Sequence, residues 1–523
     1  MPNRLRYHIW YSTRQRITTS VLVAVLLTGG TLIAIDQAND PEDRSCAPGV
    51  ERPAGSEECV GVSSNGYDFS VPELKEVVQA IDRENDTLEK DSYATVALML
   101  PFTSTDMGKR TKILHEMQGA YLQQYRANHE SNGELPKIRL VLANTGKNDA
   151  HWAPVVERLG NMTDAPDRLR AVSGVATSST QIKEAVAELT ARKGIAVVGT
   201  TITADDIANG AKGKDPYPGL ARVSPTNRDE ARALAHFGKV RPDKALLVQD
   251  TVTGDRYTDT LKTAFADLLK GAPYEPQLFT SPDDPTEEGT TPNTFRQITH
   301  LICDTSADTV YFAGRHTQLR QFINALGARG CRDRAFTVLT GDEGSYLGGD
   351  RKLNRAALSS TSKVTVRYAA LAHPGAWADA SKAPKTGGSP AAYKSFTDLL
   401  ARAEKPGGIG PIGATSLNDG QAIVAYDALA LAVHGIRQAK GAGEKLVPEP
   451  AEVADQWTRV KGSLRVEGAS GWICLDNHGN PHNKAVPVVE LARDGSQRFV
   501  EVAWPEGKAP SKTCLPPGGG AGS

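Results

Sequence analysis

The sequence of 523 residues is poor in aromatic side chains and has no excess of either charge. Phe, Trp and Tyr make up 6% of the chain, and 60 lysines and arginines are balanced by 61 acidic residues, which gives a net charge of −1. A nucleic-acid-binding protein needs a basic patch or stripe, so we expect no nucleic-acid partner. Internal repeats and long low-complexity segments are also missing from the sequence.

Signatures of common catalytic and metal sites are missing as well. The sequence contains no P-loop, no His-Glu-x-x-His motif and no Gly-x-Ser-x-Gly nucleophile elbow. His478 and His482 have a metal-like spacing, but Gly479 and Pro481 would break the helix that brings two such side chains to one face. We therefore expect a protein that is not an enzyme and that holds neither a metal ion nor another cofactor.

One long uncharged run is present near the amino terminus, at residues 17–35. It is preceded by four arginines without an acidic residue: Arg4, Arg6, Arg14 and Arg16. Such a run is long enough to cross a bilayer core of about 30 Å, and its basic flank is expected to stay in the cytoplasm. The pattern predicts a single-pass anchor in the cell membrane, with a cytoplasmic amino terminus and an extracellular main domain. A signal peptide cleaved at a poor site is the alternative, because Asp36 and Gln37 disrupt the small-residue positions.

All six cysteines follow this run: Cys46, Cys59, Cys303, Cys331, Cys474 and Cys514. An even number of cysteines in an oxidising compartment indicates disulfides rather than metal ligands or a nucleophile, although six cysteines allow 15 pairings. Cys303 and Cys331 each precede a predicted strand, with one helix between the strands, so we expect them to meet at one sheet edge and to pair. We also expect a short loop closed by Cys46 and Cys59, and a tail bridge between Cys474 and Cys514.

From Tyr93 onward, short apolar strands alternate with amphipathic helices. This alternation is typical of parallel sheets covered by helices on both faces. A first series ends near residues 220–223, and a second series of similar size starts at residue 245. The pattern predicts an α/β protein with two sheets, and residues 36–67, rich in Pro, Gly, Ser and charge, are predicted as a spacer.

Two neighbouring stretches run an apolar strand into hydroxyl residues and then into a helix, at residues 171–180 and 195–206. They carry four candidate ligand-binding hydroxyls: Ser178, Ser179, Thr201 and Thr203. A helix start leaves backbone N–H groups unpaired and is partly positive, so two adjacent turns of this kind can hold an anionic or polar group. The alternative is that each hydroxyl only caps its own helix, and Thr203 fits that role best.

The order of elements between Tyr93 and Val502 resembles the type I periplasmic binding fold of leucine/isoleucine/valine-binding proteins, the substrate-binding components of ABC transporters. Short motifs carry the resemblance, in the order they have in that family: residues 174–180, 197–207, 220–226, 250–257, 341–344, 426–428 and 471–479. The chain departs from the family at Thr258, where relatives have glycine, and in its predicted anchor.

This resemblance implies two lobes, each a parallel sheet flanked by helices, and the transmembrane helix predicted from residues 17–35 would precede them. The expected segments are 1–16 (cytoplasmic head), 17–35 (anchor), 36–90 (spacer and helix), 91–225 with 371–460 (lobe I), 226–370 with 461–505 (lobe II) and 506–523 (tail).

The resemblance also implies an amino-acid-like solute bound between the lobes by hinge closure and presented to an ABC permease. The hydroxyls would take the carboxylate, and Asp342 or Glu343 would take the ammonium, unless one of these acids only caps the next turn. Tyr257 would close over the solute, or be a surface aromatic residue at a helix start. The alternative functions are a ligand-sensing receptor ectodomain that acts through a partner protein, and a surface protein that kept only the fold.

Overall fold

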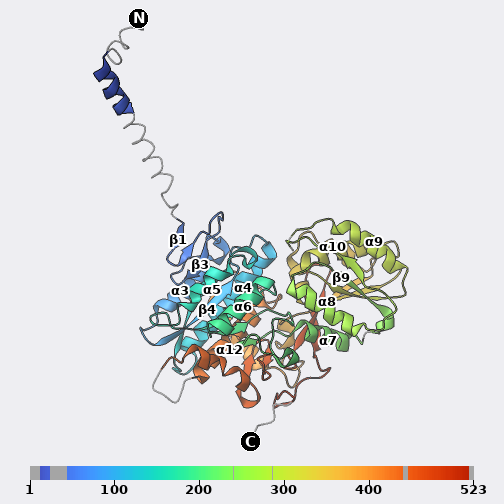
Figure 1. Ribbon diagram of the computed structural model, residues 1–523. Coiled ribbons are helices and arrows are strands. Elements are labelled where there is room, and N and C mark those ends of the chain that lie inside the picture. Colours follow the sequence, from blue (N-terminus) through green and yellow to red (C-terminus); the bar gives the residue numbers. More distant parts are fainter. Residues whose placement is uncertain (1–11, 24–43, 240, 285–286, 440–445, 518–523) are drawn as a thin grey trace. The chain divides into compact units, whose positions relative to one another are not determined.

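A computed structural model describes residues 12–23, 44–239, 241–284, 287–439 and 446–517 (Figure 1). The chain divides into two compact units, residues 1–46 and 47–523. In the first unit residues 13–23 are helical, and the remainder of the predicted anchor, 24–35, lies outside the described residues. Among the residues described, no helix has both the length and the apolar character needed to cross a membrane.

The first lobe of the second unit is built on an eight-stranded sheet in the order β1-β2-β3-β5-β4-β6-β7-β8. Its strands are β1 (Ser45–Ala47), β2 (Val50–Glu51), β3 (Val60–Ser63), β4 (Tyr93–Leu100), β5 (Lys137–Asn144), β6 (Leu169–Gly174), β7 (Ala196–Gly199) and β8 (Leu220–Arg222). Strands β4 to β8 pair in parallel, as expected, and are almost wholly buried, because helices cover both faces.

The edge of this sheet corrects two predictions. Strand β3 pairs antiparallel with β5 and with β2, so the sheet is mixed rather than wholly parallel. Residues 45–63, predicted as part of a spacer, instead contain the three short strands β1, β2 and β3, and the apolar side chains of Val50, Val60 and Val62 are buried. The same segment supports neighbouring loops, since Glu58 accepts a hydrogen bond from the backbone N–H of Lys147 (2.6 Å) and from the Thr103 hydroxyl.

Helices of the first lobe come from both halves of the chain. They are α3 (Lys75–Asp86), α4 (Met107–His129), α5 (Trp152–Gly160), α6 (Thr180–Ala187), α11 (Pro390–Glu404), α12 (Gln421–Gln438) and α13 (Pro450–Ala454). Helix α12 packs directly on α4, as Figure 1 shows by the red-orange ribbon beside the cyan one. A Cβ atom on Gly119 of α4 would lie 2.0 Å from the carbonyl oxygen of Ala422, so only glycine allows this close approach.

The second lobe has a seven-stranded sheet in the order β10-β9-β11-β12-β13-β16-β17. Its strands are β9 (Ala245–Asp250), β10 (Gln277–Phe279), β11 (Thr309–Ala313), β12 (Phe336–Thr340), β13 (Val364–Ala369), β16 (Val486–Leu491) and β17 (Gln497–Ala503). Strands β9 to β13 are parallel, whereas β16 and β17 are antiparallel, so this sheet is also mixed. Its helices are α7 (Asn227–Gly238), α8 (Arg256–Leu268), α9 (Thr291–Cys303) and α10 (His316–Gly327).

The chain passes between the two sheets three times, as a two-lobed fold requires. It leaves the first sheet after β8, returns to the first lobe after β13, and enters the second sheet again at β16. The small hairpin of β14 (Val466–Gly468) and β15 (Gly471–Ile473) precedes the last passage and packs on α12. In this way the first lobe acquires helices α11 to α13, which lie far from β8 in the sequence.

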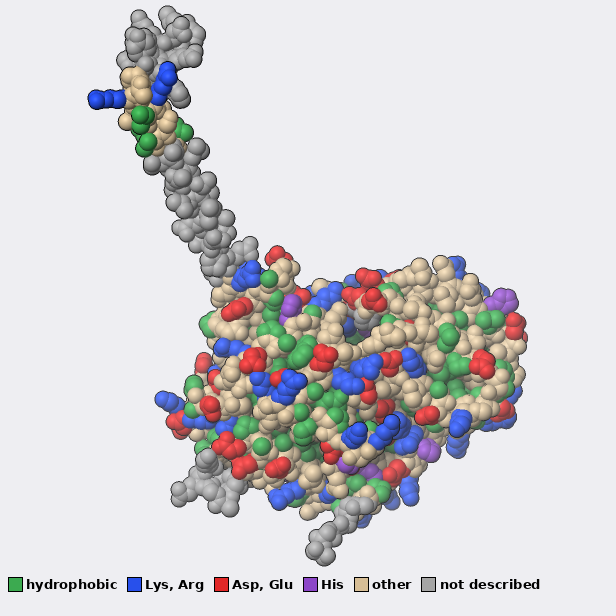
Figure 2. All heavy atoms as spheres, viewed as in Figure 1, with side chains coloured by type: hydrophobic (Ala, Val, Ile, Leu, Met, Phe, Trp, Pro, Cys, Tyr) green, Lys and Arg blue, Asp and Glu red, His purple; other side chains and the backbone are tan. Residues whose placement is uncertain are grey.

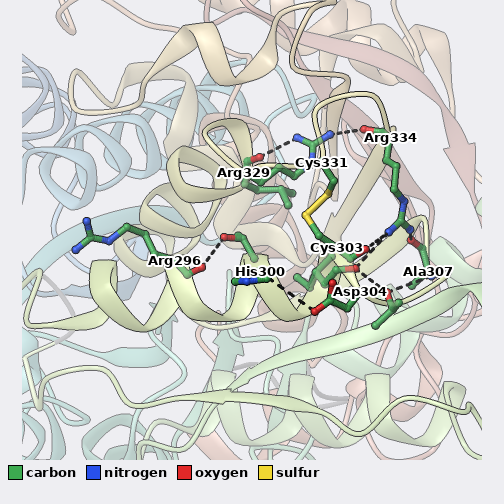
Figure 3. Close-up of a disulfide and its surroundings, with 12 residues drawn as sticks. Arg296, His300, Cys303, Asp304, Ala307, Arg329, Cys331 and Arg334 are labelled. Atoms are coloured by element: carbon green, nitrogen blue, oxygen red, sulfur yellow. Dashed lines mark hydrogen bonds and ion pairs between the residues drawn. A yellow bond between two sulfur atoms is a disulfide. The ribbon is translucent and has the colours of Figure 1, made fainter.

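Disulfides join Cys303 to Cys331 and Cys474 to Cys514, the pairs expected from the sequence. Cys46 and Cys59 are also disulfide-bonded. Cys303 is the last residue of α9, and Figure 3 shows its bridge beside Arg334, which donates a hydrogen bond to the carbonyl of Cys303 (2.8 Å).

On the face of the molecule shown in Figure 2, basic and acidic side chains are interspersed, in keeping with the balanced composition.

Candidate functional site

A pocket lies between the lobes, where the carboxyl ends of central strands of the two sheets face each other. Its walls include six of the seven predicted ligand-binding residues: Ser178, Thr201, Thr203, Tyr257, Asp342 and Glu343. They also include five polar side chains that were not predicted from the sequence: Lys109, Lys112, Thr177, Arg315 and Tyr346. The free space inside is about 40 Å³, enough for about three water molecules.

Direct contacts between the lobes explain why the pocket is small. The backbone N–H of Tyr257 donates to the carbonyl of Ser178 (3.2 Å), and the Thr180 hydroxyl donates to the carbonyl of Gly254 (2.9 Å). Arg256 forms an ion pair with Asp206 (3.0 Å). These bonds hold the two lobes against each other beside the pocket.

The three hydroxyls of the first lobe follow β6 and β7 and are nearly inaccessible to solvent. Ser178 Oγ accepts hydrogen bonds from the N–H groups of Thr203 (3.0 Å) and Ala204 (3.1 Å), and so ties the two turns together. Thr201 Oγ1 donates to the carbonyl of Ala176 (2.8 Å). Thr203 Oγ1, in contrast, is fully buried and has no hydrogen-bond partner among the residues that the structure describes. A buried hydroxyl is rarely left unbonded, so Thr203 has capacity for a ligand.

Ser179 lies apart from these hydroxyls and does not line the pocket. Its Oγ accepts from the backbone N–H of Ile182 (3.2 Å), which makes it the N-cap of α6. From the sequence, each hydroxyl could bind a ligand or only cap a helix, and Thr203 was the one that fitted capping best. The structure gives the opposite assignment for Ser179 and Thr203. Ser179 is a helix cap, whereas Thr203, which fitted capping best, caps no helix that the structure describes.

Tyr257 lies in the first turn of α8 and is 1% exposed, so the alternative of a surface aromatic residue is wrong. Burial raises the pKa of its phenol well above the usual value, and the phenol oxygen accepts a hydrogen bond from the N–H of Glu343 (3.4 Å). The ring lies under the guanidinium of Arg315, 4.7 Å from the ring centroid. Tyr257 thus forms part of the pocket wall that the second lobe contributes.

Glu343 is already fully bonded within the second lobe. One carboxylate oxygen accepts from Arg315 Nη1 (2.7 Å), and the other accepts from the backbone N–H (3.0 Å) and Nδ1 (2.7 Å) of His316. Burial acts to raise the pKa of Glu343, but Arg315 and His316 overcome it and hold that pKa well below its usual range. Its charge is therefore neutralised without any solute.

Asp342 has the open position that Glu343 lacks. It is buried, its Oδ1 has no hydrogen-bond partner within the described ranges, and its backbone N–H donates to Glu230 (3.2 Å). Burial, followed by the negative charge of Glu343, raises the pKa of Asp342 to about 7. Burial likewise raises the pKa of Glu230 well above its usual value. Of the two acids left open by the sequence, Asp342 is the one with a free oxygen.

Arg315 is the main site residue that the sequence analysis missed. Its Nε and Nη2 bind both carboxylate oxygens of Asp255 (2.7 and 2.6 Å), and Nη2 also donates to the Ser178 carbonyl in the other lobe (3.2 Å). Arg315 follows β11 at its carboxyl end, as Asp342 follows β12. The rule that residues after parallel strands gather at one sheet edge could therefore have selected it.

Comparison with known proteins gives matches in structure but not in sequence. No family model matches the chain, and no curated protein matches it either. A branched-chain amino acid transporter substrate-binding protein, LivJ, from Streptococcus pneumoniae in complex with isoleucine, is 16% identical with a TM-score of 0.54, covering 79% of this chain and 99% of that one. A leucine-binding protein, LivK, from Thermotoga maritima gives the same four values.

A third solved structure has a different solute. It is an ABC transporter solute-binding protein from R. palustris in complex with 4-hydroxybenzoate, 14% identical with a TM-score of 0.53, covering 79% of this chain and 96% of that one. At these identities the likeness concerns the fold. It extends over nearly the whole of each of these three proteins, so both lobes are included.

Proposed function

We propose that this chain, which has the type I periplasmic-binding-protein fold, is an extracytoplasmic solute-binding protein that captures an amino-acid-like molecule between its lobes. The observation that carries the proposal is the pocket between the lobes, in which the Thr203 hydroxyl and one oxygen of Asp342, from opposite lobes, are buried without a hydrogen-bond partner in the described parts of the chain. A molecule bound to both groups would hold the lobes together, which is how hinge closure depends on a ligand.

The two open groups suit the two ends of an amino acid. A carboxylate would accept hydrogen bonds from Thr203 and from the neighbouring hydroxyl of Ser178, whose oxygen accepts from two backbone N–H groups, whereas the proton of Thr201 is donated to the Ala176 carbonyl. An ammonium group would bind Asp342, and its positive charge would favour the ionised form of this carboxyl and so lower its pKa from about 7. Isoleucine and 4-hydroxybenzoate, found in the similar structures, share only the carboxylate.

Delivery of the solute to an ABC permease is part of the same proposal. Residues 17–35 would anchor the protein in the cell membrane, with the binding domain outside and the short amino-terminal head in the cytoplasm. An anchor raises the effective concentration of the domain near a membrane partner without any new contact. A sensor that signals through a partner protein would use the same closure.

The test is thermal unfolding of the full chain in a mild detergent, with amino acids, small amides and organic acids. A solute at 100 times its Kd stabilises the folded state by about 2.7 kcal/mol. In Thr203→Val, we expect a bound solute to lose about tenfold or more in affinity, because a hydrogen bond to a charged group contributes about 1.5–3 kcal/mol. Stability without solute should not fall, since the hydroxyl has no partner to lose.

Thr190→Val is the matched control. Thr190 is also buried, but its hydroxyl donates to the carbonyl of Val186 (2.8 Å) and does not face the pocket. This variant should lose about 1 kcal/mol of stability and keep its affinity. The proposal is wrong if no compound in a broad panel shifts the melting temperature and no small molecule copurifies with the chain.

A further inference from the structure

Two lysines that line the pocket have few acidic side chains close enough to pair with their positive charges. Lys109 and Lys112 lie one turn apart near the start of α4, and both line the pocket. Lys109 Nζ donates one hydrogen bond, to Asn148 Oδ1 (3.2 Å), and makes no ion pair with any residue that the structure describes. Lys112 Nζ donates to the carbonyl of Ala176 (3.2 Å) and lies 3.7 Å from Glu116.

The acids around these lysines accept hydrogen bonds from other groups, and only Glu116 also lies at ion-pair distance from one of them, Lys112. Asp106 accepts from the backbone N–H of Lys109 (2.8 Å) and caps α4, and Asp149 accepts from the Thr145 hydroxyl (2.6 Å). Glu116 is fully buried, and burial raises its pKa to about 7, so it is only partly ionised at neutral pH. Glu343 is bonded to Arg315 and His316.

Lys109 is half-buried at the pocket wall, so this lack of a partner is significant. Burial and the nearby charge of Arg315 lower the pKa of Lys109, whereas Asp106, Asp149 and Glu343 raise it only in part. A buried ammonium group normally has a carboxylate or another anion against it. Here Lys109 faces a pocket in which the described chain supplies no such group at ion-pair distance.

We infer that the pocket selects a solute with a second negatively charged group, which Lys109 and Lys112 bind, in addition to the carboxylate held by the hydroxyls of the first lobe. This inference rests on the proposed function and narrows its solute class to acidic amino acids and short dicarboxylic acids. A neutral aliphatic side chain would cover the half-buried Lys109 without pairing its charge, which is unfavourable.

The experiment measures Kd by calorimetry on the full chain in a mild detergent. Aspartate is compared with asparagine, and glutamate with glutamine, because each pair has nearly the same shape and differs in one charge. We expect the acid of at least one pair to bind tenfold or more tighter than its amide. In Lys109→Met the ratio of acid affinity to amide affinity should fall to about twofold or less, because the acid binds more weakly. Lys112→Met should lower the same ratio.

Lys394→Met is the control, because Lys394 lies on α11 with its side chain 72% exposed and is paired only with Asp398. In this variant the ratio of acid affinity to amide affinity should equal that of the unmodified chain. The inference is overturned if the amides bind as tightly as the acids, or if Lys109→Met weakens acid and amide equally. If Lys109→Met does not fold, the ratio of acid affinity to amide affinity in the unmodified chain still tests the inference.

Failure of the inference and failure of the proposed function give different results. If neutral amino acids bind and Thr203→Val weakens them, the proposed function stands and the second anionic group is excluded. If no acid, amide or neutral amino acid binds at all, both fail.

Discussion

The guanidinium of Arg315 holds together several groups of the second lobe, and its removal gives a sharp test of the site. It is paired with Asp255 and Glu343, and the three side chains are 15%, 15% and 7% exposed. Breaking a buried ion pair by removing one partner costs about 3–5 kcal/mol, because the other charge is left unpaired. We predict that Arg315→Met lowers the free energy of unfolding by about 3 kcal/mol, the lower end of that range.

The lower end applies because both carboxylates keep other partners. Glu343 keeps two hydrogen bonds from His316. Asp255 still caps α8, accepting from the N–H of Tyr257 (3.1 Å) and from the Thr258 hydroxyl (3.0 Å). The residual cost therefore falls mainly on Asp255, and adding Asp255→Asn to Arg315→Met should recover part of the loss.

Urea unfolding followed by circular dichroism and by tryptophan fluorescence measures this change, and agreement of the two probes tests two-state behaviour. Arg241→Met is the control: Arg241 is also paired with an aspartate, Asp243, but its side chain is 69% exposed. An exposed pair contributes at most about 1 kcal/mol. If Arg315→Met costs no more than Arg241→Met, the assignment of a buried, stabilising cluster is wrong.

Three further predictions concern other parts of the chain. Replacing Cys303 and Cys331 by alanine should cost about 3.5 kcal/mol, because the bridge closes a loop with a sequence separation of 28; unfolding with and without a reductant measures it. Gly119→Ala should lower the free energy of unfolding by about 1–3 kcal/mol, because the new methyl group would overlap the Ala422 carbonyl. An unchanged melting temperature would contradict this. Glu116 keeps its proton up to about pH 7 when folded but only to about pH 4.5 when unfolded, so its contribution to stability falls as pH rises through this window. Relative to the unmodified chain, Glu116→Gln should therefore gain on the order of 3 kcal/mol between pH 4.5 and 7, and parallel pH profiles of the two proteins would refute this.

Much of the fold follows from local pattern. The continuous apolar strands β4, β6 and β7 are recognisable in the sequence because a parallel strand covered on both faces needs no polar alternation. The same reasoning places Ser178, Thr201 and Asp342 at strand ends, and the structure brings them to one pocket. Strand β3 was harder to predict, because it is short. Its two apolar residues, Val60 and Val62, are separated by Gly61 and lie within a Pro/Gly-rich segment.

The individual roles of the site residues could not be read from the sequence, because each depends on a partner far away along the chain. Ser179 and Thr203 both follow strands, yet one bonds to Ile182 of its own helix and the other to nothing. Asp342 and Glu343 are adjacent, but only Glu343 meets Arg315, 28 residues earlier. The apolar spacing of α4 indicates a helix with a buried face, but nothing in it shows that Lys109 and Lys112 line the pocket between the lobes.

The amino-terminal strands determine where a shortened protein for crystallisation or calorimetry should begin. A version starting near Tyr67 keeps every residue of the pocket but removes β3, and so exposes the edge of β5 to pairing with other chains. It also removes Glu58, the acceptor for the Lys147 N–H and the Thr103 hydroxyl in loops that follow β5 and β4. A starting point no later than about residue 44 preserves these contacts, so apparent loss of binding in a shorter version would reflect its boundary rather than the pocket.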